Sequence, residues 1–260
     1  MPTVVITGAS MGIGRALARA WAARGATLVL SARGSAALED VAREVERAGG
    51  RAFVEVGDVT DEAHRVRLIA RAATEGGGVD VLVNNAGRGF YAPTMQIDVD
   101  AMRALFELNV FGPLRLTQLA APHLERARGT VVMMSSIAGV VAAPRYGAYA
   151  ASKFALEAIS MAMRSELADK GVRVVVIRPG PVDTPFRANA ARAEGMIGYD
   201  SPDPNAQSAE AVARLTLRAV DRAKPIVETS RYVRFASAAS RFAPAGLRFA
   251  LKRMAARPAS

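Results

Sequence analysis

The chain has 260 residues, 51% hydrophobic and 22% charged, which is typical of a globular domain and excludes a disordered or fibrous protein. It contains no cysteine, which excludes disulfide bonds and thiolate metal sites, and no apolar run approaches the roughly 18 residues of a membrane-spanning helix. The net charge is +10, and after Glu228 the chain contains seven basic and no acidic residues, so the excess is concentrated at the C-terminal end.

Apolar runs of strand length alternate with helical patterns along most of the chain. The expected strands are residues 3–7, 27–31, 52–56, 79–83, 130–134, 172–177 and 226–228. Helical patterns such as 13–24 and 36–48 lie between them and end at glycines. The alternation predicts an α/β fold, a single domain with a doubly wound parallel sheet of about seven strands and helices on both faces. Residues 1–228 would form its body and residues 229–260 a basic, aromatic helical extension of the same domain.

The first strand leads into the glycine-rich stretch "TGASMGIG", residues 7–14. Gly8 would permit a tight turn, Gly12 a close approach of the backbone to a pyrophosphate, and Gly14 close packing of the following helix. The N-terminal N–H groups of that helix would face the anion. We therefore expect a dinucleotide site here, to which Ser10 and Ile13 of the same turn also contribute.

The end of the second strand is where an acidic residue would bind the 2′-hydroxyl of an adenosine ribose. This chain has Ser31, Ala32 and Arg33 there, so no carboxylate would repel a 2′-phosphate and a guanidinium could bind one. This pattern favours NADP(H) over NAD(H). The alternative is that Arg33 is an ordinary surface arginine.

Two further strand ends carry candidate cofactor contacts. Asp58, followed by Val59, could accept a hydrogen bond from the adenine amine, cap the helix that starts near residue 61, or do both. After the fourth strand comes "NNAG", in which the asparagines could tie adjacent strands together. Asn85 is a candidate cofactor contact, and Ala86 and Gly87 would leave room for a cofactor against the backbone.

The stretch "YAASK" places a tyrosine and a lysine on one helical stripe. With about 100° per residue, Tyr149, Lys153, Leu156, Met163 and Leu167 fall within about 40° of one line, so the pair lies on the face that packs. A lysine there needs a reason, because burying an unpartnered ammonium is costly.

Acid–base chemistry supplies that reason. A tyrosine with its ordinary pKa of about 10 is a poor catalyst near neutrality, and a nearby ammonium would lower that pKa. Ser136 follows the fifth strand, where ligands collect in such sheets, and its hydroxyl could hold a substrate oxygen while Tyr149 transfers the proton.

At this point the sequence resembles the short-chain dehydrogenase/reductase family, which has a Rossmann fold. "TGASMGIG", "NNAG", "LNVFG", "SSIAG", "YAASK" and "RPGPVDT" occur in the family's order and spacing, from residue 3 to about 228. The resemblance implies that Tyr149 is the general acid/base and Ser136 positions the carbonyl. It also implies that Lys153 binds the nicotinamide ribose and depresses the tyrosine pKa, and that Asn109 completes a proton relay through water. Further cofactor contacts implied by the resemblance are Asn85, Pro179, Gly180, Val182 and Thr184.

The C-terminal end departs from many members of that family. They end in a "TG…VDGG" segment that builds a tetramer interface, whereas this chain ends in an Arg/Phe-rich tail. The departure puts the usual tetramer in doubt and leaves homodimer and homotetramer open. The tail could cover the substrate cleft, pair subunits or contact a membrane surface. The simpler alternative is a solvated helical face with its phenylalanines packed on the body.

These patterns together predict an NADP(H)-dependent oxidoreductase of ketones, aldehydes or alcohols, acting as a reductase on an apolar small molecule. Rival interpretations are an NADP(H)-binding regulator without turnover and a protein that works through its tail at a membrane or nucleic acid, although we expect no nucleic-acid partner. The chain begins directly with a strand, which favours a cytoplasmic location, with peripheral membrane contact left open. His64 and His123 lack ligand spacing, and we expect no metal. Residues expected to border the substrate cleft are Phe90, Tyr91, Arg145, Tyr146, Phe186 and Met196.

Overall fold

The computed structural model describes residues 1–194, 196, 203 and 205–256. A seven-stranded sheet runs through the centre, in the order β11-β7-β6-β4-β1-β2-β3, and every neighbouring pair is parallel. Its strands are β1 (Thr3–Thr7), β2 (Thr27–Ala32), β3 (Arg51–Val56), β4 (Val81–Asn84), β6 (Thr130–Met134), β7 (Arg173–Arg178) and β11 (Ile226–Glu228). The predicted doubly wound sheet is confirmed, with strand ends that differ from the expected ones by at most two residues.

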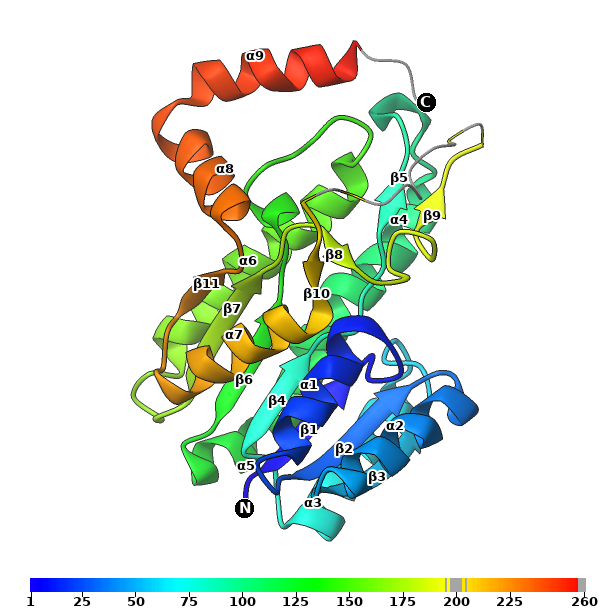
Figure 1. Ribbon diagram of the computed structural model, residues 1–260, viewed down its shortest axis with the longest axis vertical. Helices are drawn as coiled ribbons and strands as arrows, with labels where there is room; N and C mark the ends of the chain where they lie inside the picture. Colours follow the sequence, from blue (N-terminus) through cyan, green and yellow to red (C-terminus); the bar gives the residue numbers. More distant parts are fainter. Residues whose placement is uncertain (195, 197–202, 204, 257–260) are drawn as a thin grey trace.

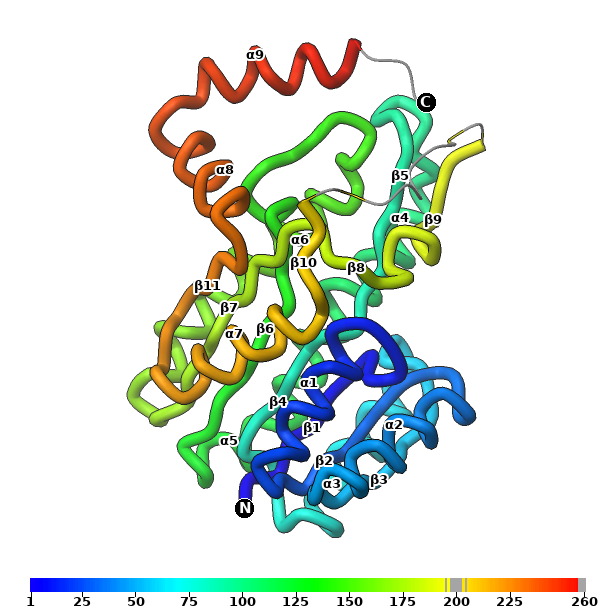
Figure 2. The backbone as a smooth tube through the Cα atoms, viewed as in Figure 1, coloured from blue at the N-terminus to red at the C-terminus, as the bar shows by residue number. Residues whose placement is uncertain are grey.

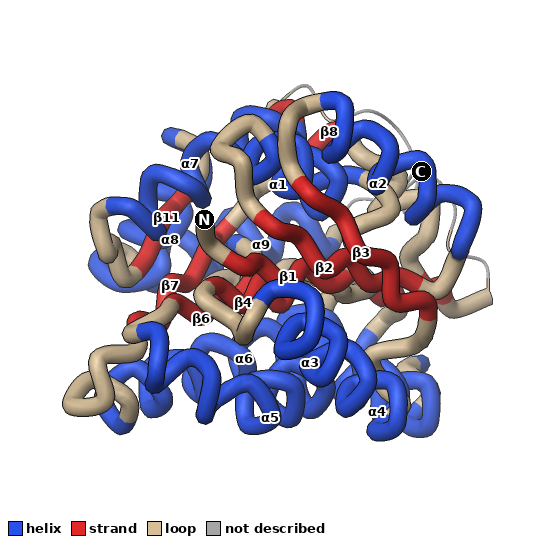
Figure 3. Tube along the Cα trace, turned by 90° about the horizontal axis from the view of Figure 1, so that it is seen from below, coloured by secondary structure: helices blue, strands red, loops and turns tan. Residues whose placement is uncertain are grey.

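Helices cover both faces of this sheet (Figures 1 and 3). On one face lie α1 (Gly12–Ala22), α2 (Ser35–Arg47) and α7 (Ala209–Asp221). On the other lie α3 (Glu62–Gly76), α4 (Val99–Phe106), α5 (Gly112–Ala127) and α6 (Gly147–Glu166). The short helical turns are η1 (Thr94–Gln96), η2 (Glu107–Phe111) and η3 (Ile137–Gly139).

The strands carry apolar side chains on both faces, as a parallel sheet between two helical layers requires. In β1, Val4 and Ile6 join the core cluster that contains Leu17 of α1, whereas Val5 joins the cluster that contains Leu68 of α3. Successive strand side chains point to opposite faces, so one strand serves both cores. This explains why the strands appear in the sequence as continuous apolar runs.

Within the residues that the structure describes, four short strands lie outside the central sheet and were not expected from the sequence. They are β5 (Phe90–Tyr91), β8 (Val182–Asp183), β9 (Ala191–Arg192) and β10 (Gln207–Ser208). β5 pairs with β9, and β8 pairs with β10. Two-residue strands carry no periodicity, so the region from 180 to 208 looks like one loop in the sequence.

The C-terminal residues form two helices, α8 (Arg231–Phe242) and α9 (Pro244–Ala255). Figure 2 shows them rising from the end of β11 and extending beyond the carboxyl edge of the sheet. Val233 is the buried residue of α8, and α9 has none. The expectation that the tail phenylalanines pack on the body is wrong, because Phe235, Phe242 and Phe249 are all exposed. Arg257 lies outside the described residues.

Candidate active site

The carboxyl edge of the sheet brings the sequence motifs together. Along the chain, β2 and β3 are added on one side of β1, and β4, β6, β7 and β11 on the other. The direction reverses between β1 and β4, which is where ligands bind in open α/β sheets. The glycine-rich turn follows β1 and "NNAG" follows β4, so both motifs lie at this reversal.

The glycine-rich turn is closed so tightly that a side chain would not fit. A Cβ on Gly14 would lie 2.1 Å from the carbonyl oxygen of Gly8 and 2.7 Å from Asn85 Nδ2. Gly8 itself has φ +64°, in the left-handed region that favours glycine. The helix α1 begins at Gly12 with no side-chain cap and no acidic residue in its first turn. Its N–H donors and dipole are therefore available to an anion.

Asn85 holds this turn against the neighbouring strand. Its Nδ2 donates to the carbonyl oxygens of Thr7, at 2.9 Å, and Gly8, at 3.1 Å. In return, Thr7 Oγ1 accepts the backbone N–H groups of Asn85 and Ala86, at 3.1 and 3.0 Å. The expectation that the asparagines tie adjacent strands together is confirmed, since Asn84 Nδ2 also lies 3.5 Å from Met133 Sδ of β6, besides donating to Thr117 of α5 at 3.0 Å.

Arg33 and Asp58 lie at the adjoining strand ends. The N–H of Ala9 donates to the carbonyl of Ser31, which places the end of β2 beside the glycine-rich turn. Arg33 follows directly, is exposed, and has no hydrogen bond or ion pair with any residue that the structure describes. Asp58 accepts from Thr60 N and Oγ1, and it is Asp61 that caps α3. The proposed capping role of Asp58 is therefore wrong, because its carboxylate is turned into its own loop.

Asn109 lies on a π-helical turn that interrupts the run from α4 to α5. Gly112 N–H donates to the carbonyl of Glu107, five residues earlier. Pro113 has no N–H and cannot make the α-helical bond to the carbonyl of Asn109. Such turns are frequent at functional sites. The turn places the fully buried Asn109 beside Gly87, whose Cβ would lie 3.1 Å from Asn109 Oδ1.

A buried serine that the sequence reasoning missed joins Asn109 to the "YAASK" helix. Asn109 Nδ2 donates to Ser152 Oγ at 3.0 Å, and Ser152 Oγ donates to the carbonyl of Tyr149 at 2.7 Å. Asn109 also exchanges two hydrogen bonds with the backbone of Arg88, both at 3.0 Å. Ser152 could have been found from its position: it lies between the two reactive residues, one turn after Tyr149.

Tyr149 and Lys153 are both buried on the packing face of α6, as the stripe predicted. Lys153 Nζ lies 5.7 Å from the centre of the Tyr149 ring and donates to the carbonyl of Met134 at 2.8 Å. Ser136 is close enough to Tyr149 for its hydroxyl to lower the tyrosine pKa, and its Oγ accepts the N–H of Ala138 at 3.1 Å. The structure thus brings Tyr149, Ser136, Lys153 and Asn109 to one place at the carboxyl edge.

The pKa values of the pair differ from the expectation. Burial raises the pKa of Tyr149 well above its usual value, and the hydrogen bond with Ser136 opposes this only in part. Burial lowers the pKa of Lys153 to about 8, with the Glu157 carboxylate acting in the opposite direction. In the protein alone, Lys153 therefore does not depress the tyrosine pKa, because loss of hydration dominates both groups.

The depressed pKa of Lys153 makes folding stability depend on pH. Between about pH 8 and the unfolded value near 10.4 the unfolded chain binds more protons, so the free energy of unfolding rises with pH in this window. In Lys153→Met this contribution is absent. We expect the free energy of unfolding of the parent, relative to that of Lys153→Met, to rise by about 2–3 kcal/mol from pH 8 to pH 10. Urea unfolding of both proteins at several pH values measures it, and parallel curves would refute the argument.

Aromatic side chains form an apolar wall beside Tyr149. The Tyr146 ring centroid lies 4.5 Å from that of Tyr149 and 4.6 Å from that of Tyr91, and Phe186 lies 5.8 Å from Tyr149. Phe90 belongs to the same core cluster. Two other residues expected at the cleft do not belong to this aromatic wall. Arg145 donates to the carbonyl of Ala255 in α9 at 3.3 Å, and Met196 is half-buried beyond β9.

The segment after β7 crosses the front of the glycine-rich turn. Pro179 accepts the N–H of Ile137 at 2.9 Å, which fixes this segment beside Ser136. A Cβ on Gly180 would lie 2.9 Å from Val233 Cγ2, so this glycine lets α8 approach. Val182 is half-buried in β8, and Thr184 Cγ2 would lie 3.0 Å from a Cβ on Gly12.

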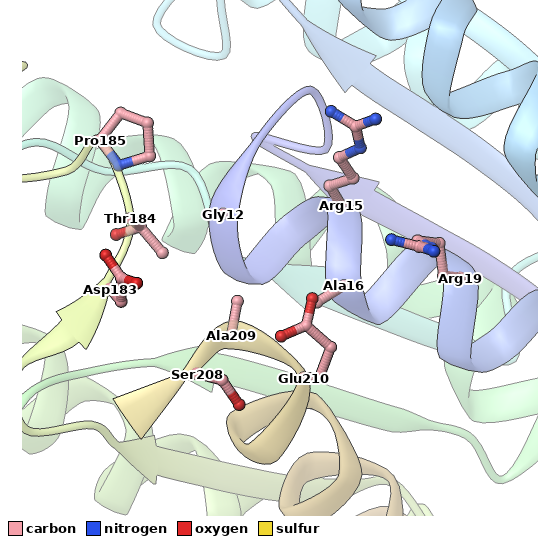
Figure 4. A pocket seen from close by; sticks show the side chains of 10 residues that line it. All are labelled: Gly12, Arg15, Ala16, Arg19, Asp183, Thr184, Pro185, Ser208, Ala209 and Glu210. Carbon is pink, nitrogen blue, oxygen red and sulfur yellow. The ribbon is translucent and has the colours of Figure 1, made fainter. Parts of the chain in front are cut away.

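A cavity of about 330 Å³ opens on the α7 side of this turn (Figure 4). Gly12 and Thr184 line it, with Arg15 and Arg19 on one side and Glu210 below. It continues from the glycine-rich turn but includes none of the four residues around Tyr149. The two parts of the site are therefore a glycine-lined anion cradle and a buried acid–base cluster.

The histidines take no part in this cluster. His64 is fully buried and shares a 2.8 Å hydrogen bond between its Nε2 and Ser31 Oγ, while His123 Nδ1 bonds Arg126 on the surface of α5. Within the described ranges, no group of three or more His, Cys, Asp or Glu side chains could hold a metal ion.

The residues present fit a dinucleotide. The turn between β1 and the uncapped start of α1 forms an anion-binding site, which we call the anion cradle. Gly8 has a positive φ there, and Gly14 leaves no room for a Cβ. The "NNAG" backbone borders this cradle. Lys153 Nζ would lie 3.6 Å from a Cβ on Gly87, so the ammonium faces the same space. A cradle of this kind beside a tyrosine–serine–lysine cluster defines a nucleotide-dependent oxidoreductase site.

The chain belongs to the short-chain dehydrogenase family. The family model described as short chain dehydrogenase matches residues 2–195. The mouse protein named dehydrogenase/reductase SDR family member 7B is 37% identical over 242 residues, covering 88% of this chain and 73% of that protein. The resemblance inferred from the motifs is thereby confirmed.

Solved structures agree on the fold and differ in their cofactor. A short-chain dehydrogenase from Sphingobium yanoikuyae in complex with NADPH matches with a TM-score of 0.80 and 27% identity, over all of this chain and 98% of that one. A short-chain dehydrogenase/reductase from Burkholderia phymatum in complex with NAD has a TM-score of 0.83 and 24% identity, over 96% and 95%. The two neighbours therefore contain different nicotinamide cofactors.

Proposed function

We propose that this protein is an NADP(H)-dependent oxidoreductase that interconverts a ketone or aldehyde and an alcohol, working mainly as a reductase on an apolar substrate. The observation that carries the proposal is the position of buried Tyr149, whose ring centre lies 5.7 Å from Lys153 Nζ, at the sheet edge that also carries the glycine-rich turn. When bound, the cofactor would supply the hydride. Protein residues would then position the carbonyl and deliver the proton.

Tyr149 would be the proton donor. Its raised pKa keeps the phenol protonated at neutral pH, which suits donation to a substrate oxygen as that oxygen gains negative charge. Ser136 would hold the same oxygen by its hydroxyl. After donation, the phenolate would be stabilised by Ser136 and by the ammonium of Lys153, whose electrostatic effect is strong where water is excluded.

Asn109 would take part in the proton relay through its backbone and not through its side chain. Its side chain is fully committed to Arg88 and Ser152, so the carboxamide fixes the π-helical turn and does not itself transfer protons. The relay through water that the family resemblance implies would therefore start from the carbonyl oxygen of Asn109. This oxygen lacks its usual helical partner, because Pro113 has no N–H.

The cofactor would lie along the carboxyl edge. Its pyrophosphate would face the turn formed by Gly8, Ser10, Gly12, Ile13 and Gly14. Its adenosine would lie between Arg33 and the pair Asp58 and Val59, and its nicotinamide ribose would meet Lys153. Remaining contacts would come from Asn85, Ala86, Gly87, Pro179, Gly180, Val182 and Thr184.

Arg33 supports the choice of NADP(H). It is exposed at the end of β2, has no acceptor among the described residues, and no carboxylate precedes it in Ser31 and Ala32. We expect Arg33→Asp to lower the NADPH/NADH preference, measured as the ratio of kcat/KM values, by about 100-fold, because it removes one charge-assisted contact and adds a repulsion. Arg47→Asp, on an exposed turn of α2, is the matched control. An unchanged ratio in Arg33→Asp would remove this residue from the cofactor assignment.

The aromatic wall supports an apolar substrate. Tyr146, Tyr91 and Phe186 present ring surfaces beside Tyr149, and burial raises the pKa of Tyr146, so its phenol stays neutral. Ring surfaces of this kind beside the proton donor would favour substrates with apolar or aromatic groups next to the carbonyl.

We infer a homo-oligomer, either dimer or tetramer. Exposed apolar side chains on η2 and α6, namely Phe111, Phe154 and Met161, support a contact between copies on that face of the sheet. A cytoplasmic location stays a prediction.

A panel of carbonyl compounds tests the function directly. NADPH consumption is followed for aliphatic ketones, aromatic ketones, steroids and aldehydes, with product detected by mass spectrometry. Turnover of an apolar member, with one alcohol formed per NADPH, is the expected result. Tight NADPH binding without turnover across the panel would instead support the rival interpretation of a catalytically silent regulator.

A further inference from the structure

The helix α8 presents an apolar stripe to solvent. Phe235 and Phe242 are 75% and 77% exposed, and they are seven residues apart, which places them on one face. Val233 is fully buried and lies about 200° around the helix from Phe235, so the stripe points directly away from the body. An apolar stripe that faces away from the core has no function in folding.

The helix α9 extends this surface. Phe249 is 60% exposed and Met254 is 49% exposed. Figures 1 and 2 show α9 running across the far end of the molecule, beyond the carboxyl edge of the sheet. We call the exposed side chains of α8 and α9 the tail surface.

The tail surface is uniformly cationic. Six basic side chains lie on α8 and α9, and none of them forms an ion pair with any residue in the described ranges: Arg231, Arg234, Arg241, Arg248, Lys252 and Arg253. Sequence alone explains this, because no acidic residue follows Glu228. Two of the guanidinium groups lie over phenylalanine rings, Arg241 over Phe242 at 5.3 Å and Arg253 over Phe249 at 4.7 Å.

Several surface arginines outside the tail do have carboxylate partners. Arg24 bonds Asp221 in bidentate fashion at 2.8 and 2.9 Å, and Arg115 lies 2.7 Å from Glu62. The six tail cations, by comparison, form no ion pair with the described residues, so their charge is available to an external anion.

We propose that the tail surface docks on an anionic lipid bilayer. Exposed phenylalanines flanked by arginines and lysine form the pattern of a helix that lies in the membrane interface, with rings at the acyl boundary and cations at lipid phosphates. Among the described residues, no helix has the length and apolarity to cross a membrane, so the contact would be with the surface. Each basic residue near an anionic leaflet strengthens such binding severalfold.

Other partners fit the tail surface less well. A second copy meeting the same face would place six cations against six, which opposes association. A duplex nucleic acid would be bound by the cations but would leave the Phe235 and Phe242 stripe without a role. A lipid surface uses both the charge and the outward aromatic rings.

Docking would orient the molecule. The tail helices lie beyond the carboxyl edge of the sheet, and α8 is fixed there by Val233 against Gly180. The edge that carries Tyr149 would therefore face the bilayer, and the N-terminal edge of the sheet would face away from it.

Vesicle co-sedimentation of the full chain tests the proposal. Phosphatidylcholine vesicles are compared with phosphatidylcholine–phosphatidylserine vesicles at about 7:3, each at about 0.1 and 0.5 M salt. We expect binding to the anionic vesicles only, weakened at high salt. Equal binding to both kinds of vesicle, or binding to neither, would overturn the proposal.

Paired variants identify the surface. Arg234→Gln with Arg241→Gln should weaken vesicle binding by about 30-fold, whereas Arg43→Gln with Arg47→Gln on α2 removes the same charge elsewhere and should change it less than about threefold.

Phe235→Ala with Phe242→Ala should weaken vesicle binding at least about tenfold. The control for the rings is Met95→Ala with Val99→Ala, on exposed positions of η1 and α4.

Three results would contradict the assignment. One is that the α2 variant weakens binding as much as the α8 arginine variant, which would indicate a response to net charge alone. Another is that the protein binds duplex DNA tightly and that Phe235→Ala with Phe242→Ala weakens neither DNA binding nor vesicle binding. The third is that the wild-type protein is a dimer and binds no vesicles, and that Phe235→Ala with Phe242→Ala converts it to a monomer. Thermal unfolding of every variant shows that losses do not come from misfolding, and none of these measurements depends on NADPH turnover.

Discussion

Tyr149→Phe is expected to lower kcat for carbonyl reduction by about 10²–10⁴-fold, because it removes the hydroxyl that donates the proton and keeps the ring. NADPH binding should change little, since the phenol is turned toward Ser136 and packed against Tyr146 and Phe186. Steady-state kinetics on the preferred substrate and fluorescence titration of NADPH separate the two effects.

The matched control removes a phenol outside the site. Tyr232→Phe changes an exposed side chain on α8 and should retain activity within about twofold. If Tyr149→Phe were as active as the parent, Tyr149 would not be the proton donor and the proposed mechanism would be wrong. A fall in both activity and NADPH binding would point instead to a structural role of the hydroxyl.

Gly14→Ala is expected to abolish NADPH binding and to lower the free energy of unfolding by about 3 kcal/mol or more. The new methyl group would lie 2.1 Å from the Gly8 carbonyl oxygen and 2.7 Å from Asn85 Nδ2, so the turn or the helix must move. Both neighbours belong to the network that holds the cradle closed. Urea unfolding and NADPH titration measure the two consequences.

Gly34→Ala provides the control for this substitution. Gly34 precedes α2 with φ −94°, and a Cβ there meets no atom within 4 Å. It should leave both the unfolding free energy and NADPH binding nearly unchanged. Equal behaviour of the two alanine variants would show that the contact between α1 and the glycine-rich turn is not what shapes the cradle.

The fold could be predicted from the sequence because its signals are local and repeated. Val4, Val5 and Ile6 form a continuous apolar run because β1 is buried on both faces, and the helices between the strands end at glycines such as Gly25 and Gly77. The two-residue strands β5 and β8 to β10 could not be predicted, since pairing between distant segments creates them.

Site residues within one local motif could be predicted from the sequence. Properties that depend on packing between distant segments could not. The stripe of Tyr149 and Lys153 follows from helical spacing and is confirmed. The position of Ser152 one turn after Tyr149 was a signal, but its hydrogen bond to Asn109, 43 residues away, could not be predicted from the sequence. The pKa of Tyr149 was expected to fall and instead rises, because the degree of burial cannot be read from spacing.

The C-terminal helices show the same limit. Their phenylalanines were expected to pack on the body, as apolar residues in a helical pattern usually do. In the structure Val233 alone serves that purpose on α8, and Phe235 and Phe242 face outward. A sequence reveals the stripe but not which side of the helix meets the core.

Transfer of deuterium tests the central claim most directly. The protein is incubated with an apolar ketone and NADPH that carries deuterium at the reactive carbon of its nicotinamide, and the alcohol is analysed by mass spectrometry. We expect one deuterium at the carbinol carbon of each alcohol molecule formed by the parent, and almost no labelled alcohol with Tyr149→Phe. Tight NADPH binding with no labelled alcohol from any substrate, or equal labelling by parent and Tyr149→Phe, would contradict it.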